Sequence, residues 1–148
     1  MRMVKCEELN ADMICRLIDR AIEGMSYAYT PYSGFRVGAA LLTESGEIYT
    51  GCNIENVAYT PTNCAERTAF FNAVSEGERH FAAICIVGGK DGKLADYTSP
   101  CGVCRQVMME FCEPEQFKII LAISREEYRI YTLKELLPEG FGPARLAR

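Results

Sequence analysis

Apolar residues near the start of the chain recur at steps of three and four, which is the spacing of a helix with one buried face. The pattern runs over 7–29, and its apolar positions are Met13, Ile14, Leu17, Ile18, Ala21, Ile22 and Met25. Further helical patterns cover 64–75, 101–111 and 133–137. Asn63 precedes the second of these and has a side chain well suited to cap a helix. The chain is therefore predicted to contain three substantial helices and a short fourth one.

Runs of apolar and β-branched residues between these segments predict strands. The expected strands are 35–42, 47–53, 82–87, 117–122 and 128–131. A turn at 44–46 joins the first two as a hairpin. This order of helices and strands indicates an α/β fold of three layers, in which a mixed sheet of about five strands has helices on both faces. The Gly- and Pro-containing segment 138–143 is expected to be an irregular tail.

Composition and charge narrow the class of protein. The 148 residues are 49% hydrophobic and 24% charged, which fits one folded domain, 1–148. The net charge is −4 and the basic residues are scattered, which argues against a nucleic-acid partner and for a small neutral substrate. The chain has no apolar run of membrane-spanning length, and its N-terminus lacks the apolar core of a signal peptide. We therefore expect a cytoplasmic protein that has no membrane partner.

Eight cysteines in a chain expected to lie in a reducing compartment point to core packing, metal binding or catalysis rather than disulfides. Cys85, inside the apolar run 82–87, is expected in the core. Cys101 and Cys104 form a C-x-x-C motif where a helix is predicted to start. Residues three apart share a helix face, so both sulfurs can reach one ion, and the positive end of the helix dipole favours thiolates. Alone, the motif fits a redox dithiol or half of a zinc ribbon equally well.

A second predicted helix start carries Cys64 and Glu66. At the open first turn both side chains can point past the helix end toward a common point. Three thiolates, from Cys64, Cys101 and Cys104, would leave one position of a tetrahedral Zn²⁺ open, as catalytic zinc requires. Zinc lowers the pKa of water in such a position toward ~7, and Glu66 beside it is the candidate general base. This order, with Pro100 before the C-x-x-C motif, matches the pattern of zinc deaminases.

Simpler roles exist for the same residues. The three cysteines could hold a structural zinc if a fourth ligand stood at a matching spacing, but the lone histidine, His80, follows a polar turn and is expected to face solvent. A redox role for Cys101 and Cys104 leaves Cys64 and Glu66 without a purpose. Glu66 by itself could be an ordinary first-turn carboxylate that stabilises its helix.

Four blocks of sequence carry a resemblance to a known family. They are 32–39 (YSGFRVGA), 51–59 (GCNIENVAY), 64–69 (CAERTA) and 99–107 (SPCGVCRQV). In this order and spacing the chain resembles the small homotetrameric cytidine deaminases over nearly its whole length, except for the stretch before about Leu9. The resemblance implies one Zn²⁺ per subunit and hydrolytic deamination of cytidine and deoxycytidine in pyrimidine salvage. It also implies a homotetramer whose sites are shared between subunits.

The resemblance also implies roles in substrate binding. Asn53 and Glu55 are similar to the family's ribose-binding pair and, at positions i and i+2, lie on one face of a strand end. Phe35 matches an aromatic residue that packs on the base, and Phe141 one that a neighbouring subunit supplies. Tyr59 lies in the loop that crosses between subunits. The backbone of Ala65 and Cys101 would meet the edge of the base. Taken singly, Asn53 and Glu55 fit a solvated strand end equally well, and the three aromatic side chains fit core or interface packing.

The charge of the metal centre suggests a role for an arginine. Three thiolates around Zn²⁺ leave a net negative charge, which would weaken zinc as a Lewis acid. Arg67 follows Glu66 directly and is expected to donate a hydrogen bond to a thiolate, with Arg105 as the second candidate. A surface ion pair is the alternative role for Arg67.

Three other functions compete with nucleoside deamination. A deaminase of another cytosine compound, such as a nucleoside antibiotic, is disfavoured by the pair Asn53 and Glu55. A polynucleotide deaminase is disfavoured by the acidity and short length of the chain. A non-catalytic zinc-binding module would not need Glu66.

Overall fold

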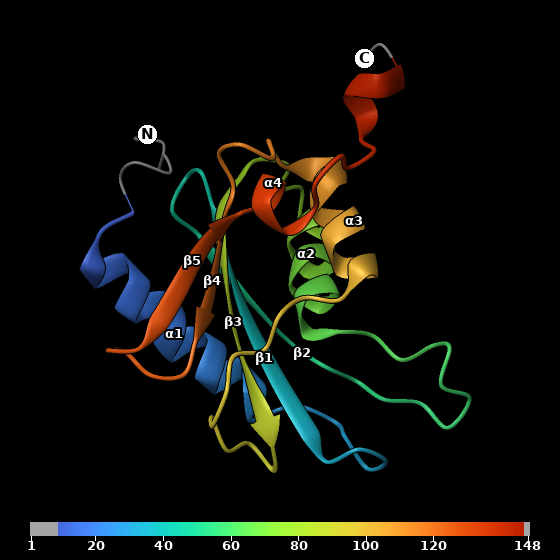
Figure 1. Ribbon diagram of the computed structural model, residues 1–148. Helices are drawn as coiled ribbons and strands as arrows, with labels where there is room; N and C mark the ends of the chain where they lie inside the picture. The colour runs from blue at the N-terminus through green and yellow to red at the C-terminus, as the bar shows by residue number, and fades with distance from the viewer. Residues whose placement is uncertain (1–8, 147–148) are drawn as a thin grey trace.

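The computed structural model describes residues 9–146 and contains one mixed sheet with helices on both faces (Figure 1). The helices are α1 (Ala11–Met25), α2 (Ala65–Ser75), α3 (Gly102–Phe111) and the short α4 (Leu133–Leu136), and a 3-10 helix (Pro143–Leu146) follows in the tail. The strands are β1 (Phe35–Thr43), β2 (Ile48–Cys52), β3 (Phe81–Lys90), β4 (Lys118–Ala122) and β5 (Tyr128–Thr132). The predicted three-layer α/β fold is thus confirmed.

The order of strands across the sheet is β2-β1-β3-β4-β5. Only β3 and β4 pair in parallel, and α3 lies between them in the chain, as a crossover between parallel strands requires. Helix α1 covers one face of the sheet, and α2, α3 and α4 cover the other (Figure 1). Consequently α2 and α3 are neighbours although 26 residues separate the end of one from the start of the other.

The central strand β3 supplies both layers of the core. Its side chains alternate, so that Ile84 and Ile86 pack with α2 and α3, whereas Cys85 and Val87 pack with α1. All four are fully buried, which confirms the expectation that Cys85 is a core residue. Because both faces of β3 are covered, its sequence reads as a continuous apolar run.

The first helix is shorter at both ends than the sequence pattern indicated. The Asn10 side chain caps it by accepting a hydrogen bond from the backbone N–H of Met13 at 2.9 Å, while residues 7 and 8 lie outside the described residues. At the other end, the backbone N–H of Tyr29 donates to the carbonyl of Asn53, which draws this segment into an isolated bridge with Ile54. A long-range backbone pairing therefore replaces the last predicted turn.

No helix in the described range 9–146 is both long and apolar enough to span a membrane.

Two glycines allow the helices to approach the hairpin closely. A Cβ atom on Gly38 would lie 2.0 Å from the Ala21 carbonyl oxygen of α1, and one on Gly51 would lie 2.4 Å from the Ala65 carbonyl oxygen of α2. Both obstacles are backbone atoms, which cannot rotate away. Gly51 thus allows β2 to lie directly against the first turn of α2, where Glu66 stands.

Replacing Gly51 by alanine is expected to lower the free energy of unfolding by about 1–3 kcal/mol, because the added methyl group overpacks the contact with α2. Urea denaturation would measure the change. Gly102→Ala is the matched control, since a Cβ atom there meets nothing within 4 Å and alanine favours a helix. Equal stability of the two variants would show that β2 and α2 are not held in contact as described.

Candidate metal centre

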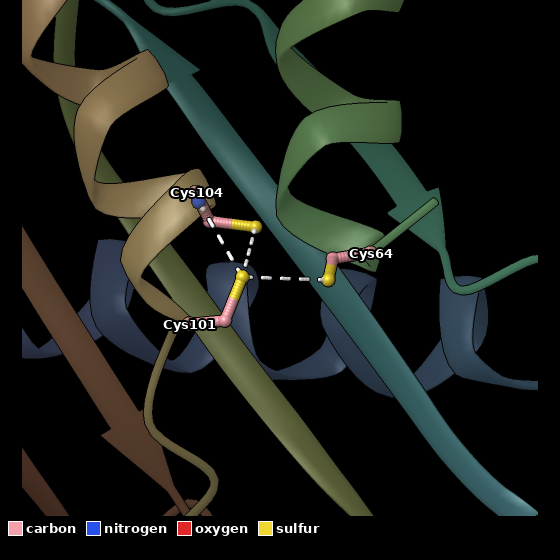
Figure 2. Close-up of side chains that lie close together, drawn as sticks. All are labelled: Cys64, Cys101 and Cys104. Carbon is pink, nitrogen blue, oxygen red and sulfur yellow. Dashed lines mark hydrogen bonds between the residues drawn. The ribbon is translucent and has the colours of Figure 1, made fainter. Parts of the chain in front are cut away.

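Two neighbouring helix starts bring three cysteine side chains together (Figure 2). Cys64 is the N-cap of α2 and Cys101 is the N-cap of α3, each with extended backbone, and Cys104 lies in the first turn of α3. The extended cap residue lets each sulfur point past the end of its helix. The sequence predicted this meeting of two segments, but it assigned the first cap to Asn63.

The prediction that Asn63 caps α2 was wrong. The backbone of Asn63 forms an antiparallel bridge with Ile54, and its side-chain Nδ2 donates to Oγ1 of Thr68 at 3.0 Å. This bridge holds Asn63 outside the helix and moves the cap one residue on, to Cys64. The shift matters for the site because the cap residue, unlike a helical one, directs its side chain across the helix end.

The spacing of the sulfur atoms fits a tetrahedral zinc ion. Sγ of Cys101 lies 3.7 Å from Sγ of Cys64 and 3.5 Å from Sγ of Cys104, and all three lie within 4.8 Å of one another. Zinc with bonds to sulfur of about 2.3 Å places its ligands about 3.8 Å apart. Cys104 is buried and Cys101 exposed, so the cluster opens to the surface on the side of Cys101. Among the described residues, this is the one group of acidic, cysteine or histidine side chains that could hold a metal ion.

Hydrogen bonds and charge favour a thiolate at Cys64. The hydrogen bond with Cys104, followed by the one from Arg67, lowers the pKa of Cys64 to about 5. Nη2 of Arg67 lies 3.2 Å from Sγ of Cys64, so the guanidinium neutralises part of the negative charge of the cluster, as the sequence predicted for Arg67. Within the described residues, Nε of Arg67 is a buried polar side-chain atom without a hydrogen-bond partner. This unmatched donor belongs to the guanidinium that contacts Cys64, and a cation with a buried free donor is suited to a fully ionised cluster.

Glu66 lies at the second helical position of α2 and is 4% exposed. Burial is the main cause that raises its pKa to about 7, and the negative charge of Cys64 adds to the effect. Its carboxylate interacts with Cys104, so it stands at the cluster itself. A carboxyl group that gains and loses a proton near neutral pH can act as both acid and base.

The structure gives Asn53 and Glu55 partners within the protein. The Asn53 side chain joins the start of β1: Oδ1 accepts from the backbone N–H of Val37 at 2.9 Å, and Nδ2 donates to the Phe35 carbonyl at 2.8 Å. The Glu55 carboxylate accepts from the backbone N–H groups of Tyr32 and Ser33 and from the Ser33 hydroxyl. The Ser33 hydroxyl is the first cause that holds the pKa of Glu55 below its ordinary value. Both side chains therefore hold neighbouring backbone in place, and the alternative role, that of a solvent-facing side chain at a strand end, does not describe them.

The predicted aromatic residues lie at the surface. Phe35, Tyr59 and Phe141 are 40%, 74% and 60% exposed, so core packing does not account for them. Tyr59 has a φ of 62°, an unusual conformation for a residue with a large side chain, and its ring meets that of Tyr32 edge to face at 6.3 Å. The carbonyl of Phe141 accepts from Nε2 of Gln106 at 2.8 Å, which ties the tail to α3.

A family model described as the cytidine and deoxycytidylate deaminase zinc-binding region matches residues 12–120. This range covers the three cysteines of the cluster and Glu66. The chain belongs to this family. Its predicted resemblance to cytidine deaminases is thereby confirmed, and the chain carries the zinc-binding region for which the family is described.

Individual relatives agree with this assignment. A cytidine deaminase of Sporosarcina psychrophila is 49% identical over 126 residues, which is 85% of this chain and 89% of that protein. The crystal structure of cytidine deaminase from Burkholderia pseudomallei is 43% identical, covers 85% of this chain and 97% of its own, and superposes with a TM-score of 0.78. That of the Mycobacterium tuberculosis enzyme is 38% identical, with 86% and 95% coverage and a TM-score of 0.74. These similarities extend over nearly the full length of each protein.

Two side chains considered as partners of the metal centre lie elsewhere. His80 is exposed, as predicted, and does not belong to the cysteine cluster, so it cannot complete a structural zinc site. Arg105 does not donate to a sulfur. It donates instead to the Pro100 carbonyl, the Ser99 hydroxyl and the Leu136 carbonyl. Two of these acceptors lie just before the C-x-x-C motif, and the third lies in α4. The position of Arg105 next to Cys104 in the sequence did not indicate any of them.

Sequence reasoning missed the residues that hold Glu55. Ser33 donates to Glu55 through both its backbone and its hydroxyl, and Nζ of Lys90 donates to the Ser33 carbonyl at 2.6 Å. Ser33 did stand in the block 32–39, but only as part of the family pattern. Lys90, at the end of β3, gave no signal because it reaches Ser33 only when β3 pairs with β1.

Proposed function

We propose that this chain is a zinc-dependent cytidine and deoxycytidine deaminase, which releases ammonia and forms uridine and deoxyuridine. The observation that carries the proposal is the meeting of three cysteine sulfurs with the buried Glu66 at two adjoining helix N-termini. Cys64, Cys101 and Cys104 would hold the zinc. Membership of the family and the similarity to cytidine deaminases of other organisms support the choice of reaction.

Glu66 is the residue that moves protons. A zinc ion at the three sulfurs would supply Lewis acidity to the water that attacks C4 of cytosine. Glu66 takes a proton from the attacking water and gives one to N3 of the ring. It then helps to transfer a proton to the amino group, which leaves as ammonia. Its burial keeps bulk water away from the carboxyl group, and its raised pKa lets it hold each proton between steps.

The backbone of Ala65 and Cys101 would contact the edge of the base. Ala65 is the first residue of α2 and Cys101 is the N-cap of α3, so both lie at the helix starts beside the cluster. Ala65 is fully buried, whereas Cys101 is exposed. Phe35 and Tyr59 would provide exposed aromatic surface around the base, and Arg67 would balance the charge of the thiolates.

The substrate panel tests the reaction directly. Purified protein with its zinc content measured is offered cytidine, deoxycytidine, cytosine, CMP and a short single strand, and uridine or ammonia formation is followed. Turnover of both nucleosides, with little for the other compounds, is expected. A fully zinc-loaded protein that deaminates none of them would be a non-catalytic module, and one that prefers CMP or the single strand would belong to a rival substrate class.

Glu55 is proposed to accept a hydrogen bond from a ribose hydroxyl, because a carboxylate has more acceptor sites than its three protein donors use. Glu55→Gln keeps the size of the side chain but removes the charge, so KM for cytidine should rise by about 10-fold or more. Steady-state kinetics with 2′,3′-dideoxycytidine provides the control, since it lacks both hydroxyls and should show no added penalty. An equal penalty for both nucleosides would assign Glu55 to holding the backbone of Tyr32 and Ser33 alone. Asn53, which shares this strand end, would orient the same sugar.

We also propose a homotetramer in which Phe141 serves the site of a neighbouring subunit. The exposed Phe141 side chain on a tail tied to α3 supports this arrangement. Phe141→Ala in a verified tetramer should raise KM for cytidine several-fold.

Mixed tetramers of Phe141→Ala and Glu66→Gln subunits distinguish action of Phe141 on a neighbouring subunit's site from action on its own subunit's site. If Phe141 acts across subunits, sites with an intact Glu66 and a neighbour's Phe141 regain wild-type KM, whereas action within one subunit would leave KM raised.

We also propose that the protein acts in the cytoplasm, in pyrimidine salvage. The seven described cysteines are free thiols, which suits a reducing compartment. Free nucleosides released by nucleic-acid turnover would be the substrates.

A further inference from the structure

The Arg105 guanidinium joins three parts of the chain around the C-x-x-C motif. Nε lies 2.8 Å from the Pro100 carbonyl oxygen and Nη2 lies 2.8 Å from Oγ of Ser99. Nη1 donates to the carbonyl of Leu136, the last residue of α4. All three acceptors are neutral, so the guanidinium acts here through the directions of its hydrogen bonds rather than through an ion pair.

The segment that Arg105 holds leads directly to a proposed metal ligand. Residues 91–100 contain no helix or strand, and Cys101 follows them as the cap of α3. Cys101 is the exposed member of the cluster, and its sulfur makes only long contacts of 3.5–3.7 Å, with the sulfurs of Cys64 and Cys104 and with the backbone nitrogen of Cys104. Cys104, by contrast, is 1% exposed and lies within the helix. The position of Cys101 therefore depends on the two residues before it.

Helix α4, which supplies the Leu136 acceptor of Arg105, is itself firmly held in the fold. Helix α4 begins with a capping box between Thr132 and Glu135, and Leu133 is fully buried. The last carbonyl groups of a helix have no partner inside it, so the Leu136 carbonyl is a free acceptor that Arg105 satisfies. Arg105 thus holds the loop before Cys101 between α3 and an element anchored in the core.

We propose that Arg105 is a positioning residue that fixes the ligand Cys101 by clamping Ser99 and Pro100 against α4. The inference rests on the proposed function, because it takes Cys101 as a zinc ligand. The guanidinium of Arg105 reaches its three acceptors from three nitrogens held in one plane, whereas the three donors of lysine all lie on one rotatable nitrogen. Loss of the clamp leaves the other two ligands in place and affects the geometry of the third.

The test compares Arg105→Lys, Arg105→Met and Ser99→Ala with Arg125→Met. Arg125 donates two hydrogen bonds to Asp19 on the opposite side of the sheet, so its variant removes a guanidinium without touching the metal loop. Zinc affinity and the rate of zinc loss to a chelator are measured, together with urea unfolding of the zinc-free proteins. Cobalt is substituted for zinc, and the sulfur-to-cobalt absorption bands report the ligand geometry at full occupancy.

Both Arg105 variants are expected to weaken zinc binding by about 10-fold or more and to shift the cobalt bands, because groups that orient a ligand without touching the metal commonly account for about 10–100-fold in affinity. Ser99→Ala should have a smaller effect in the same direction, and Arg125→Met should retain wild-type zinc affinity and spectrum. If Arg105→Met does not fold, Arg105→Lys and Ser99→Ala decide the matter. Wild-type zinc affinity and spectrum in Arg105→Lys would overturn this inference alone, whereas wild-type protein that binds no zinc would overturn the proposed function and this inference with it.

Discussion

Replacement of Glu66 by glutamine is expected to lower kcat for cytidine by about 10²–10⁴-fold, which is the usual contribution of a positioned acid–base group. The amide has nearly the same shape, so it fills the same buried position in the first turn of α2. It cannot, however, accept a proton from water and pass it to the ring. Zinc content should remain that of the wild-type protein, because the three sulfurs are untouched.

The comparison with a surface glutamate isolates the effect. Glu126, exposed in the turn between β4 and β5, provides the control variant Glu126→Gln, which should keep full activity. Steady-state kinetics and metal analysis of both variants would be measured side by side. A Glu66→Gln protein with wild-type kcat would refute the proton role and would return Glu66 to a first-turn carboxylate.

Replacement of Cys104 by alanine is expected to abolish zinc binding and, with it, deamination. Cys104 is the buried member of the cluster, and its sulfur lies 3.5 Å from that of Cys101. Two remaining sulfurs offer zinc half of a tetrahedral site, so the loss of affinity should exceed the about 10–100-fold that follows loss of an outer hydrogen bond. Zinc per subunit, measured after gel filtration, should fall close to zero.

Cys15→Ala is the matched control, since Cys15 is also a free thiol but lies on α1, on the opposite face of the sheet. It should keep both zinc and activity. Removing zinc from the wild-type protein with a chelator should abolish turnover, and adding zinc should restore it, whereas the Cys104 variant should not recover. Full turnover in zinc-free protein would exclude a catalytic metal at the cluster.

Sequence reasoning found the elements and the cysteines because their signals are local. The continuous apolar run of β3 reflects a strand buried on both faces, and the three- and four-residue steps of α1 reflect a helix buried on one face. Both elements form near where the pattern placed them. Cys101 and Cys104 lie within one helical turn, so their proximity follows from helix geometry alone. The ends of elements were less predictable: α1 ends early because Tyr29 pairs with the segment around Asn53.

Side chains with several possible partners were the harder part of the site. Arg67 and Arg105 each directly follow a chemically important residue, and from the sequence both could donate to a thiolate. In the structure only Arg67 reaches a sulfur, while Arg105 is drawn to Ser99, Pro100 and Leu136. Tertiary packing determines which acceptors lie within hydrogen-bonding distance of a long, flexible side chain, and the sequence does not show which ones these are.

The sequence by itself determined the α/β fold, the family, and the ligands and acid–base residue available for a zinc site, because these depend on periodicity and on residue types at short spacing. Only the tertiary structure decided that Cys64 rather than Asn63 caps α2, that Glu66 is buried enough to raise its pKa, and that Ser33 holds Glu55. It also placed Cys64 3.7 Å from Cys101 across 37 residues of chain. Each of these outcomes depends on how α2 and α3 pack on one face of the sheet, and therefore on distances between segments that no local pattern contains.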